Sequence, residues 1–320
     1  MLSRVADSIY WMSRYVERAE NVARFIDVNL HLHLDLPTGE QWEPMVYTTG
    51  DYAVFRERFG EATREKVIHF LAFDRDNPNS IWSCFRSARE NARSVREIIP
   101  SEIWEQVNTA YLMVDDAARR NAIMESPHEF FTQVKMASHL FTGLTVTCMP
   151  HGEVWHFCRL GRLLERADKT SRILDVKYFL LLPSAADVGT TFDSIQWSAL
   201  LRSASAFEAY RKRHGRIAPE RVVEFLLFDR EFPRAVLYCL DRAQDSLHAI
   251  SNVPEGTYSN IAEKRCGRLL SELAYTDVAD IIASGLHEFC DDFQAKLNRV
   301  GEAIFETYFA LHPVGASSNE

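Results

Sequence analysis

The sequence predicts an all-α fold built from two tandem duplicated helical-bundle units of roughly 150 residues, related by pseudo-twofold symmetry. Three observations predict it. Only 13 glycines and 11 prolines occur among 320 residues, which leaves room for long helices and disfavours a turn-rich β-sandwich. Apolar residues recur at spacings of three and four, and no segment has a persuasive strand pattern. A third observation, described below, is that ordered blocks of the first half return in the second half.

The first half reads as a series of helices with recognisable starts and breaks. Its longest predicted helix covers residues 3–33, where the apolar row is Tyr15, Ala19, Val22, Ile26 and Leu30. Leu36-Pro-Thr-Gly39 interrupts that pattern. Asn77 is the expected N-cap, and Pro78 the expected first-turn proline, of a helix that runs to about Ile99. The other predicted helices cover residues 52–59, 64–73, 101–124 and 127–149.

The second half repeats this series. We expect a long helix over residues 151–182, a connector around 182–191, and a frayed tail. The remaining predicted helices cover residues 193–213, 219–228, 233–250, 258–275 and 277–311. The predicted domain boundaries are therefore 1–150 for unit one, 151–312 for unit two and 313–320 for the tail.

Two blocks of sequence return at nearly the same offset. Residues 15–28, which contain Glu17-Arg18-Ala19, return as residues 163–176 with Glu165-Arg166-Ala167, an offset of 148. Residues 70–78 return as 225–233, an offset of 155, and each copy holds a Phe-Asp-Arg sequence that should mark the end of one helix before the next. A third, shorter echo is His-Glu-Phe at 128–130 and 287–289. Because the blocks keep their order, a duplicated unit explains them better than chance.

Composition excludes several functional classes. The net charge of −9, from 36 basic and 45 acidic residues, argues against general nucleic-acid binding. The six cysteines include no C-x-x-C pair, so neither a disulfide scaffold nor a structural zinc site is expected. Arg4 and Asp7 interrupt the place of a signal peptide, and the longest apolar run, Tyr178–Leu182, is far shorter than the ~20 residues of a membrane span. We expect a reduced, cytoplasmic protein without a membrane segment.

Polar side chains form a stripe along each of the two long helices. At 100° per residue the stripe of the first helix fills an arc of about 120° beside the apolar face. Its members are Arg14, Glu17, Arg18, Asn21 and Arg24. The second helix repeats it with Arg162, Glu165, Arg166, Lys169 and Arg172. We expect the two helices to face each other, so that Glu17 and Glu165 pair with arginines of both.

Two interpretations of the stripes stay open. In the first, they form a structural ion-pair network that fixes helix register. In the second, they form a ligand site in which guanidinium groups bind a carboxylate or phosphate, with Glu17 and Glu165 as candidate catalytic residues. The candidate anion-binding residues of this site are Arg14, Arg18, Asn21, Arg24, Arg166 and Arg172.

A row of arginines marks another helix of unit one. Arg86, Arg89, Arg93 and Arg96 share one face at steps of three and four, with Asn91 nearby. The aligned residues of unit two are Asp241, Gln244, His248 and Ser251. This asymmetry fits one anion site in unit one, in which case Arg86, Arg89 and Arg93 should line a cavity with the Glu-Arg helix. The alternative is a solvated face whose charges are neutralised by Glu90 and Glu97.

Metal and cofactor motifs are weak. Glu125-Ser-Pro-His128 and Glu153-Val-Trp-His156 have the Glu-x-x-His spacing of di-iron bundles, but neither recurs in unit two and the first spans a helix start. The sequence has no Gly-rich phosphate loop, no G-x-S-x-G motif and no H-E-x-x-H motif. We therefore expect no metal and no cofactor.

The Tyr15-Val-Glu17-Arg18-Ala19-Glu-Asn-Val-Ala-Arg24 segment resembles the bacterial alpha-E family, an all-helical family named for its Glu-Arg motif. The resemblance extends over nearly the whole chain, and its further segments are residues 73–81, 88–97 and 104–108. It implies association with ATP-grasp-type peptide or amide ligases, with transglutaminase-like proteins and with a proteasome-like peptidase. It supplies no catalytic residue that can be carried over to this chain.

Two functional hypotheses follow. The first is a noncatalytic helical scaffold or substrate-presenting partner in an ATP-grasp-linked system of peptide or amide synthesis or peptide modification. The second is an enzyme that acts on a peptide or amino-acid carboxylate between the two repeats, with Glu17 as acid/base and arginines as clamps. A deep pocket converging on Glu17 and Arg93 would favour the enzyme, and a large exposed apolar patch would favour the scaffold.

Overall fold

The computed structural model describes residues 1–35, 42–120, 126–179 and 191–310. Within these ranges every regular element is a helix, which confirms the predicted all-α class. None of the described helices combines the length and the apolar composition needed to cross a membrane. The predicted connector at 182–191 and the predicted tail at 313–320 fall largely or wholly outside the described residues.

The helices of the first half closely follow the predicted series. Their bounds are α1 (Ser3–Asp35), α2 (Glu43–Thr49), α3 (Tyr52–Phe59), α4 (Arg64–Ala72), α5 (Ile81–Ser94), α6 (Ser101–Arg120) and α7 (Pro127–Thr147). The short helix α2 was not predicted. The Phe-Asp-Arg sequence at 73–75 directly follows α4, as expected.

The second half begins with another long helix. Its bounds are α8 (Glu153–Phe179), α9 (Thr191–Ser203), α10 (Phe207–His214), α11 (Pro219–Phe228), α12 (Val236–Ser251), α13 (Ile261–Ala274), α14 (Val278–Ser284), α15 (Leu286–Ile304) and the π-helix η3 (Phe305–Phe309).

The predicted start and end of the helix over 78–99 were wrong. Ser80, in extended conformation, is the N-cap of α5, and its hydroxyl accepts a hydrogen bond from the backbone N–H of Ser83. Asn77 instead stabilises the preceding turn, since its side chain donates to the Phe70 carbonyl and accepts from the Asn79 N–H. The helix ends at Ser94, after which the Val95 N–H bonds to the Ala92 carbonyl and the Ile98 and Ile99 N–H groups close a separate turn on the Val95 carbonyl.

Two predicted helices of the second half are each broken in two. Ser205 has a φ of 51° and ends the run of α9 before α10 begins. Gly285 has a φ of 107° and separates α14 from α15. These left-handed conformations are incompatible with a continuous right-handed helix.

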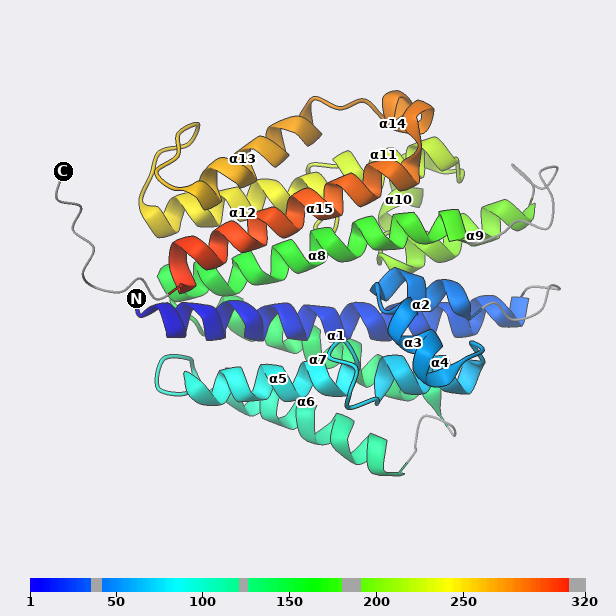
Figure 1. Ribbon diagram of the computed structural model, residues 1–320, viewed down its shortest axis with the longest axis horizontal. Helices are drawn as coiled ribbons and strands as arrows, with labels where there is room; N and C mark the ends of the chain where they lie inside the picture. The colour runs from blue at the N-terminus through cyan, green and yellow to red at the C-terminus, as the bar shows by residue number, and fades with distance from the viewer. Residues whose placement is uncertain (36–41, 121–125, 180–190, 311–320) are drawn as a thin grey trace.

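The helices α1 and α8 lie side by side through the middle of the molecule (Figure 1). On one side α5 and α7 pack against α1, and on the other α12 and α15 pack against α8. Three elements cross this division, because α2 packs on α8, and α9 and η3 pack on α1. The buried apolar side chains of both halves form one continuous core. The two long helices approach closely at Gly161, where a Cβ would clash with the backbone oxygen of Tyr10.

Candidate functional site

The Glu-Arg motifs meet at the interface between α1 and α8. The Glu165 carboxylate of α8 accepts hydrogen bonds from α1: Arg14 Nε at 2.8 Å and Arg18 Nε and Nη2 at 2.6 and 3.0 Å. The Glu17 carboxylate of α1 accepts from Arg166 of α8, with Nε at 2.8 Å and Nη2 at 2.9 Å. Each motif glutamate is thus bound by the motif arginine of the other helix. This confirms the expected packing of the two helices.

Further side chains extend this network on α1. Arg234, just before α12, donates to Glu17 Oε1 at 2.9 Å and to Glu20 Oε2 at 3.1 Å. Arg24 forms a two-point ion pair with Glu20 and donates to the Ser203 carbonyl at 3.2 Å. Asn21 donates to the backbone carbonyl of Glu17 at 2.7 Å. Most of the predicted stripe is therefore used for contacts within the protein.

The ion pairs hold the buried glutamates in their charged form. Burial alone would raise the pKa of Glu17, but Arg166 and Arg234 lower that pKa to about 2. Burial likewise opposes the charge on Glu165, yet Arg18, Arg14 and Lys169 keep the pKa of Glu165 well below its usual range. Both carboxylates are at most 2% exposed. Neither is suited to take up a proton near neutral pH.

The network contains more positive than negative charge. Four carboxylates, those of Glu17, Glu20, Glu165 and Asp168, form its acidic part. Seven arginine and lysine side chains are paired with them: Arg14, Arg18, Arg24, Arg166, Lys169, Arg172 and Arg234. Burial, together with the repulsion of Arg234, lowers the pKa of Arg24 to about 10. At the accessible edge of the network, by contrast, the neighbouring groups, Glu165 among them, outweigh burial and raise the pKa values of Arg14 and Arg18, so both are stable as cations.

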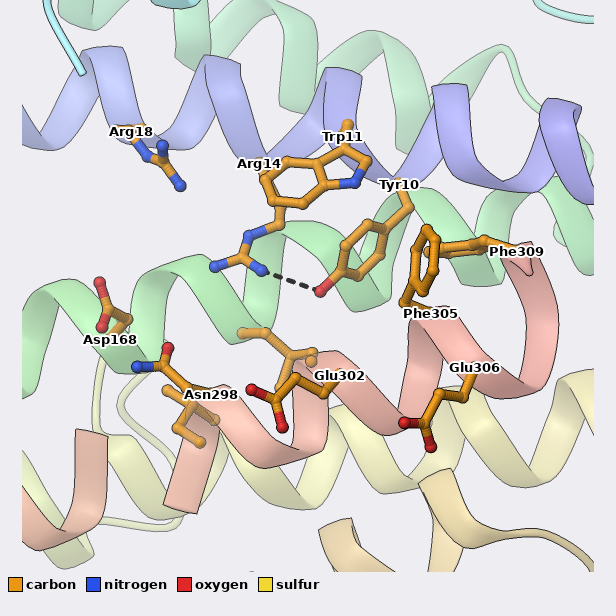
Figure 2. Close-up of a pocket in the computed structure, with 13 residues that line it drawn as sticks. Tyr10, Trp11, Arg14, Arg18, Asp168, Asn298, Glu302, Phe305, Glu306 and Phe309 are labelled. Carbon is orange, nitrogen blue, oxygen red and sulfur yellow. Dashed lines mark hydrogen bonds between the residues drawn. The ribbon is translucent and has the colours of Figure 1, made fainter. Parts of the chain in front are cut away.

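A cavity of about 620 Å³ opens at one end of this network, between α1, α8, α15 and η3 (Figure 2). Arg14 and Arg18 enter it from α1, and Asn298 and Glu302 lie across from them on α15. Aromatic rings close the end of the cavity and belong to Tyr10, Trp11, Phe305 and Phe309. Sequence reasoning did not find this cavity, because nothing in the sequence placed α15 beside α1.

Arg14 is held rigidly at the edge of the cavity. Its Nε donates to Glu165, its Nη1 donates to the Tyr10 hydroxyl at 3.0 Å, and its guanidinium carbon lies 4.9 Å from the centre of the Trp11 ring. Its Nη2 donates to no residue of the described part of the chain. Arg18, by contrast, uses Nε, Nη1 and Nη2 in bonds to Glu165 and Asn79. Of the two arginines that line the cavity, Arg14 is therefore the one with a terminal nitrogen free to bind a ligand.

A second cavity, of about 900 Å³, lies between α1, α7, α9 and α10 and reaches Arg24. Near its rim the buried Asp27 carboxylate accepts from His128 Nδ1 at 2.7 Å and from Lys135 Nζ at 2.6 Å. A matching contact joins Asp175 to His287 Nδ1 at 2.7 Å in the second half. The repeated Asp and the His-Glu-Phe echo were the sequence signals for these pairs, but their partnership was not predicted.

Two clusters bring metal-ligating atoms within 4.8 Å of one another: Asp27 with His31 and His128, and Asp175 with His287 and Asp291. In the first, both Asp27 oxygens already have partners, and His31 Nδ1 lies 2.8 Å from the Asp27 backbone oxygen. Of the sequence-level Glu-x-x-His pairs, Glu153 binds the amino terminus and Glu125 lies outside the described residues. The absence of a metal and a cofactor stays a prediction.

The arginine row of α5 is turned toward α6. Arg89 donates to Asn108 at 2.7 Å and its guanidinium lies 4.9 Å from the Tyr111 ring centre. Arg93 pairs with the partly exposed Glu90, and Arg86 lies over Trp82. None of these arginines, nor Asn91, lines either of the two cavities described above.

All six cysteines are described, and none is paired in a disulfide. Five are buried and Cys148 is exposed. Burial raises the pKa values of Cys84, Cys239 and Cys266 to about 12, so these thiols are not nucleophiles at neutral pH. The reduced state of the cysteines stays a prediction.

Comparison with known proteins places the chain in a family. It is 22% identical, over 340 aligned positions, to the uncharacterized proteins Mb2597 of Mycobacterium bovis and Rv2567 of Mycobacterium tuberculosis. The alignment covers 96% of this chain but only 37% of either relative. No solved structure matches the chain significantly. The Alpha-E family model, described as a predicted alpha-helical domain with a conserved ER motif, matches residues 1–309, and the chain therefore belongs to the Alpha-E family.

Proposed function

We propose that this protein is a noncatalytic helical scaffold, or substrate-presenting partner, for an ATP-grasp ligase that makes or modifies peptides or amides. The observation that supports this most directly is the state of the Glu-Arg motif. Glu17 and Glu165 are buried, charged and bound by arginines on both sides. A general acid or base needs a pKa near the working pH and contact with the substrate, and these carboxylates have neither.

The length of the relatives gives separate support. Since the matched region is only 37% of each mycobacterial relative, most of those chains lies outside it. A helical region that is continuous with other polypeptide in relatives is well suited to act beside another protein here. The family resemblance supplies the candidates for that partner, an ATP-grasp ligase and a transglutaminase-like protein. The unpaired thiols are compatible with a cytoplasmic complex.

We also infer that the two halves, 1–150 and 151–312, descend from one duplicated unit. Three pairs of equivalent contacts support this inference. Glu17 and Glu165 are bound reciprocally by Arg166 and Arg18. The Asp27–His128 contact has its equivalent in Asp175–His287. Arg58 pairs with Asp74 and Asp76, as Arg213 pairs with Asp229 and Glu231, at the offset of the second repeated block.

The alternative function, an enzyme acting on a peptide or amino-acid carboxylate, is supported by the cavity at Arg14. A deep pocket lined by both Glu17 and Arg93 would have been further support for the enzyme. Glu17 is 2% exposed, the Arg93 side chain is 67% exposed, and neither residue lines a cavity described above. We therefore place the noncatalytic role first.

The test is copurification of the chain with the candidate ligase, followed by ligase assays with and without it. We expect stimulation of the ligase and no turnover by the chain alone. A matched variant, Glu17→Gln combined with Arg166→Gln, removes the motif pair while changing both partners together. If the folded double variant still stimulates the ligase, Glu17 is not catalytic. Turnover of substrate by the isolated chain, lost in this variant, would contradict the proposal.

A further inference from the structure

The cavity in Figure 2 has the features of a site for a small amphiphilic carboxylate. We propose that it binds an α-amino acid or the C-terminal residue of a peptide, with an apolar side chain and a free α-carboxylate. This inference deepens the proposed function, and rests on it, because it names the group that the chain would present.

The carboxylate would bind to Arg14. Two corners of this guanidinium are fixed by Glu165 and Tyr10, so its orientation is set before a ligand arrives. The remaining nitrogen, Nη2, has no partner in the described part of the chain, and the side chain keeps 16% of its surface exposed. Preorganised guanidinium groups bind carboxylates through strong charge-assisted hydrogen bonds.

The charges that line the cavity suit a ligand with a carboxylate at one end and a nitrogen donor at the other, since Arg14 and Arg18 line one side of it and Glu302 and Glu306 the other. The seven arginine and lysine side chains of the network exceed its four carboxylates, and the Figure 2 cavity gives Arg14 and Arg18 contact with solvent. A carboxylate placed at Arg14 would compensate this excess locally without breaking any of the ion pairs, whether the ligand is the zwitterion of a free amino acid or the anion of a peptide C-terminus.

The walls of the cavity explain the rest of the ligand. Trp11, Phe305 and Phe309 offer ring surface for an apolar side chain, and 620 Å³ lies within the usual ~300–1,000 Å³ of small-molecule sites. The side chains of Asn298 and Glu302, on the opposite wall, make no hydrogen bond within the described residues (Figure 2). Their oxygens can accept from a ligand nitrogen, either the ammonium of a free amino acid or the amide N–H of a peptide.

A glycine keeps the space beside Arg14 open. At Gly301 of α15, a Cβ would lie 4.0 Å from Arg14 Nη1, so a larger side chain there would extend into the cavity. Gly301→Leu therefore fills the space beside Arg14 while leaving every residue of the Glu-Arg ion pairs in place. Gly143→Leu is the matched control, because Gly143 also lies inside a helix and has nothing within 4 Å of its Cβ position.

The experiment is calorimetric titration of the isolated full chain with L-phenylalanine, N-acetyl-L-phenylalanine and L-phenylalaninamide. We expect both carboxylates to bind and the amide, which lacks the carboxylate, to bind at least tenfold more weakly. Tighter binding of phenylalanine would identify a free amino acid as the ligand, and tighter binding of the N-acetyl compound would identify a peptide C-terminus. Glu302→Gln should weaken the binding of phenylalanine more than the binding of N-acetyl-phenylalanine.

The variants decide whether binding occurs in this cavity. Gly301→Leu should lower the affinity for phenylalanine and N-acetyl-phenylalanine at least tenfold, whereas Gly143→Leu should leave both affinities unchanged. The inference is overturned if no carboxylate binds at millimolar concentration, if the amide binds equally well, or if Gly301→Leu binds normally. Because this titration contains no ligase, its failure alongside normal ligase stimulation would reject the ligand and leave the scaffold role intact.

Discussion

Replacing Glu165 by glutamine removes one negative charge from the α1–α8 interface and keeps the shape of the side chain. In the native protein this carboxylate receives three hydrogen bonds from Arg14 and Arg18 and lies 3.6 Å from Lys169 Nζ. The glutamine would present an N–H₂ donor toward at least one of these donors. Three basic side chains would then face one another without their shared counter-charge.

The expected loss of stability follows from the burial of the site. Glu165 is 0% exposed, and removal of one partner of a buried ion pair costs about 3–5 kcal/mol. That is a large share of the ~5–15 kcal/mol by which folded domains are usually stable. At ~2–4 °C per kcal/mol, the expected fall in melting temperature is about 10 °C.

The assay is urea or thermal unfolding, followed by far-ultraviolet circular dichroism, for the native chain and the variant at several pH values. Glu306→Gln is the control, because Glu306 is exposed and has no ion pair among the described residues, so its change should stay within about 0.5 kcal/mol. A melting temperature of Glu165→Gln within 1 °C of the native value would refute the structural role of the motif.

The pH dependence gives the sign of the effect independently. The pKa of Glu165 is lower in the folded protein than in the unfolded chain, where it is about 4.3. The charged carboxylate therefore stabilises the fold fully above that unfolded-state pKa, and this stabilisation is lost as the pH falls through the folded-state pKa. The stability difference between the native chain and Glu165→Gln should be constant from pH 8 to about pH 5. It should shrink as the pH falls further. A difference that grows on acidification would contradict the argument.

The other predictions concern close packing, the arginine row and the thiols. Gly161→Ala should lower stability by about 1–3 kcal/mol or more in urea unfolding, because its Cβ meets the Tyr10 carbonyl, whereas Gly143→Ala should be neutral or stabilising. Arg89→Ala should lower the free energy of unfolding by about 1–2 kcal/mol, because it removes the bond to Asn108 and the aromatic contacts of Arg89. Arg93→Ala should lower it by less than about 0.5 kcal/mol, and equal losses of stability for the two variants in thermal melts would contradict this prediction. Ellman's reagent should react rapidly with one thiol of the native chain, Cys148, and with all six after unfolding; several fast-reacting thiols in the native chain would show that the described burial is wrong.

The sequence predicted the long helices and the partners of the motif glutamates, because both depend on periodicity and on the repeat. It did not predict the role of Arg234, which lies 217 positions from Glu17 and has no periodic relation to the motif. Its equivalent at the offset of 155 is Asn79, which contacts Arg18 through a different chemistry. Equivalent positions of the two halves thus contribute to one network with different residues, and a search for identity alone misses them.

The breaks within helices were also beyond the sequence. Residues 203–206 read Ser-Ala-Ser-Ala, which contains no helix breaker, yet Ser205 adopts a left-handed conformation where α9 gives way to α10. The Ser205 and Ala206 N–H groups close the end of α9 on the Arg202 and Leu201 carbonyls, and Arg24 of α1 donates to the Ser203 carbonyl at that point. Local propensity cannot report a contact that is 179 residues away in the chain.

The Glu-Arg motif couples the docking of α1 on α8 to the burial of both glutamates. Each motif glutamate is neutralised by arginines that include one from the other long helix, so either helix alone would bury a charge without its partner. The motif therefore makes the docking of α1 on α8 a condition for burying either stripe. The reciprocal pairing of Glu17 with Arg166 and of Glu165 with Arg18 uses only one arginine of each long helix. The network contains further basic side chains beyond these two. Arg14 is the one of them with an unused donor in a cavity, and the interface that joins the two long helices thereby also creates the place where an anion can bind.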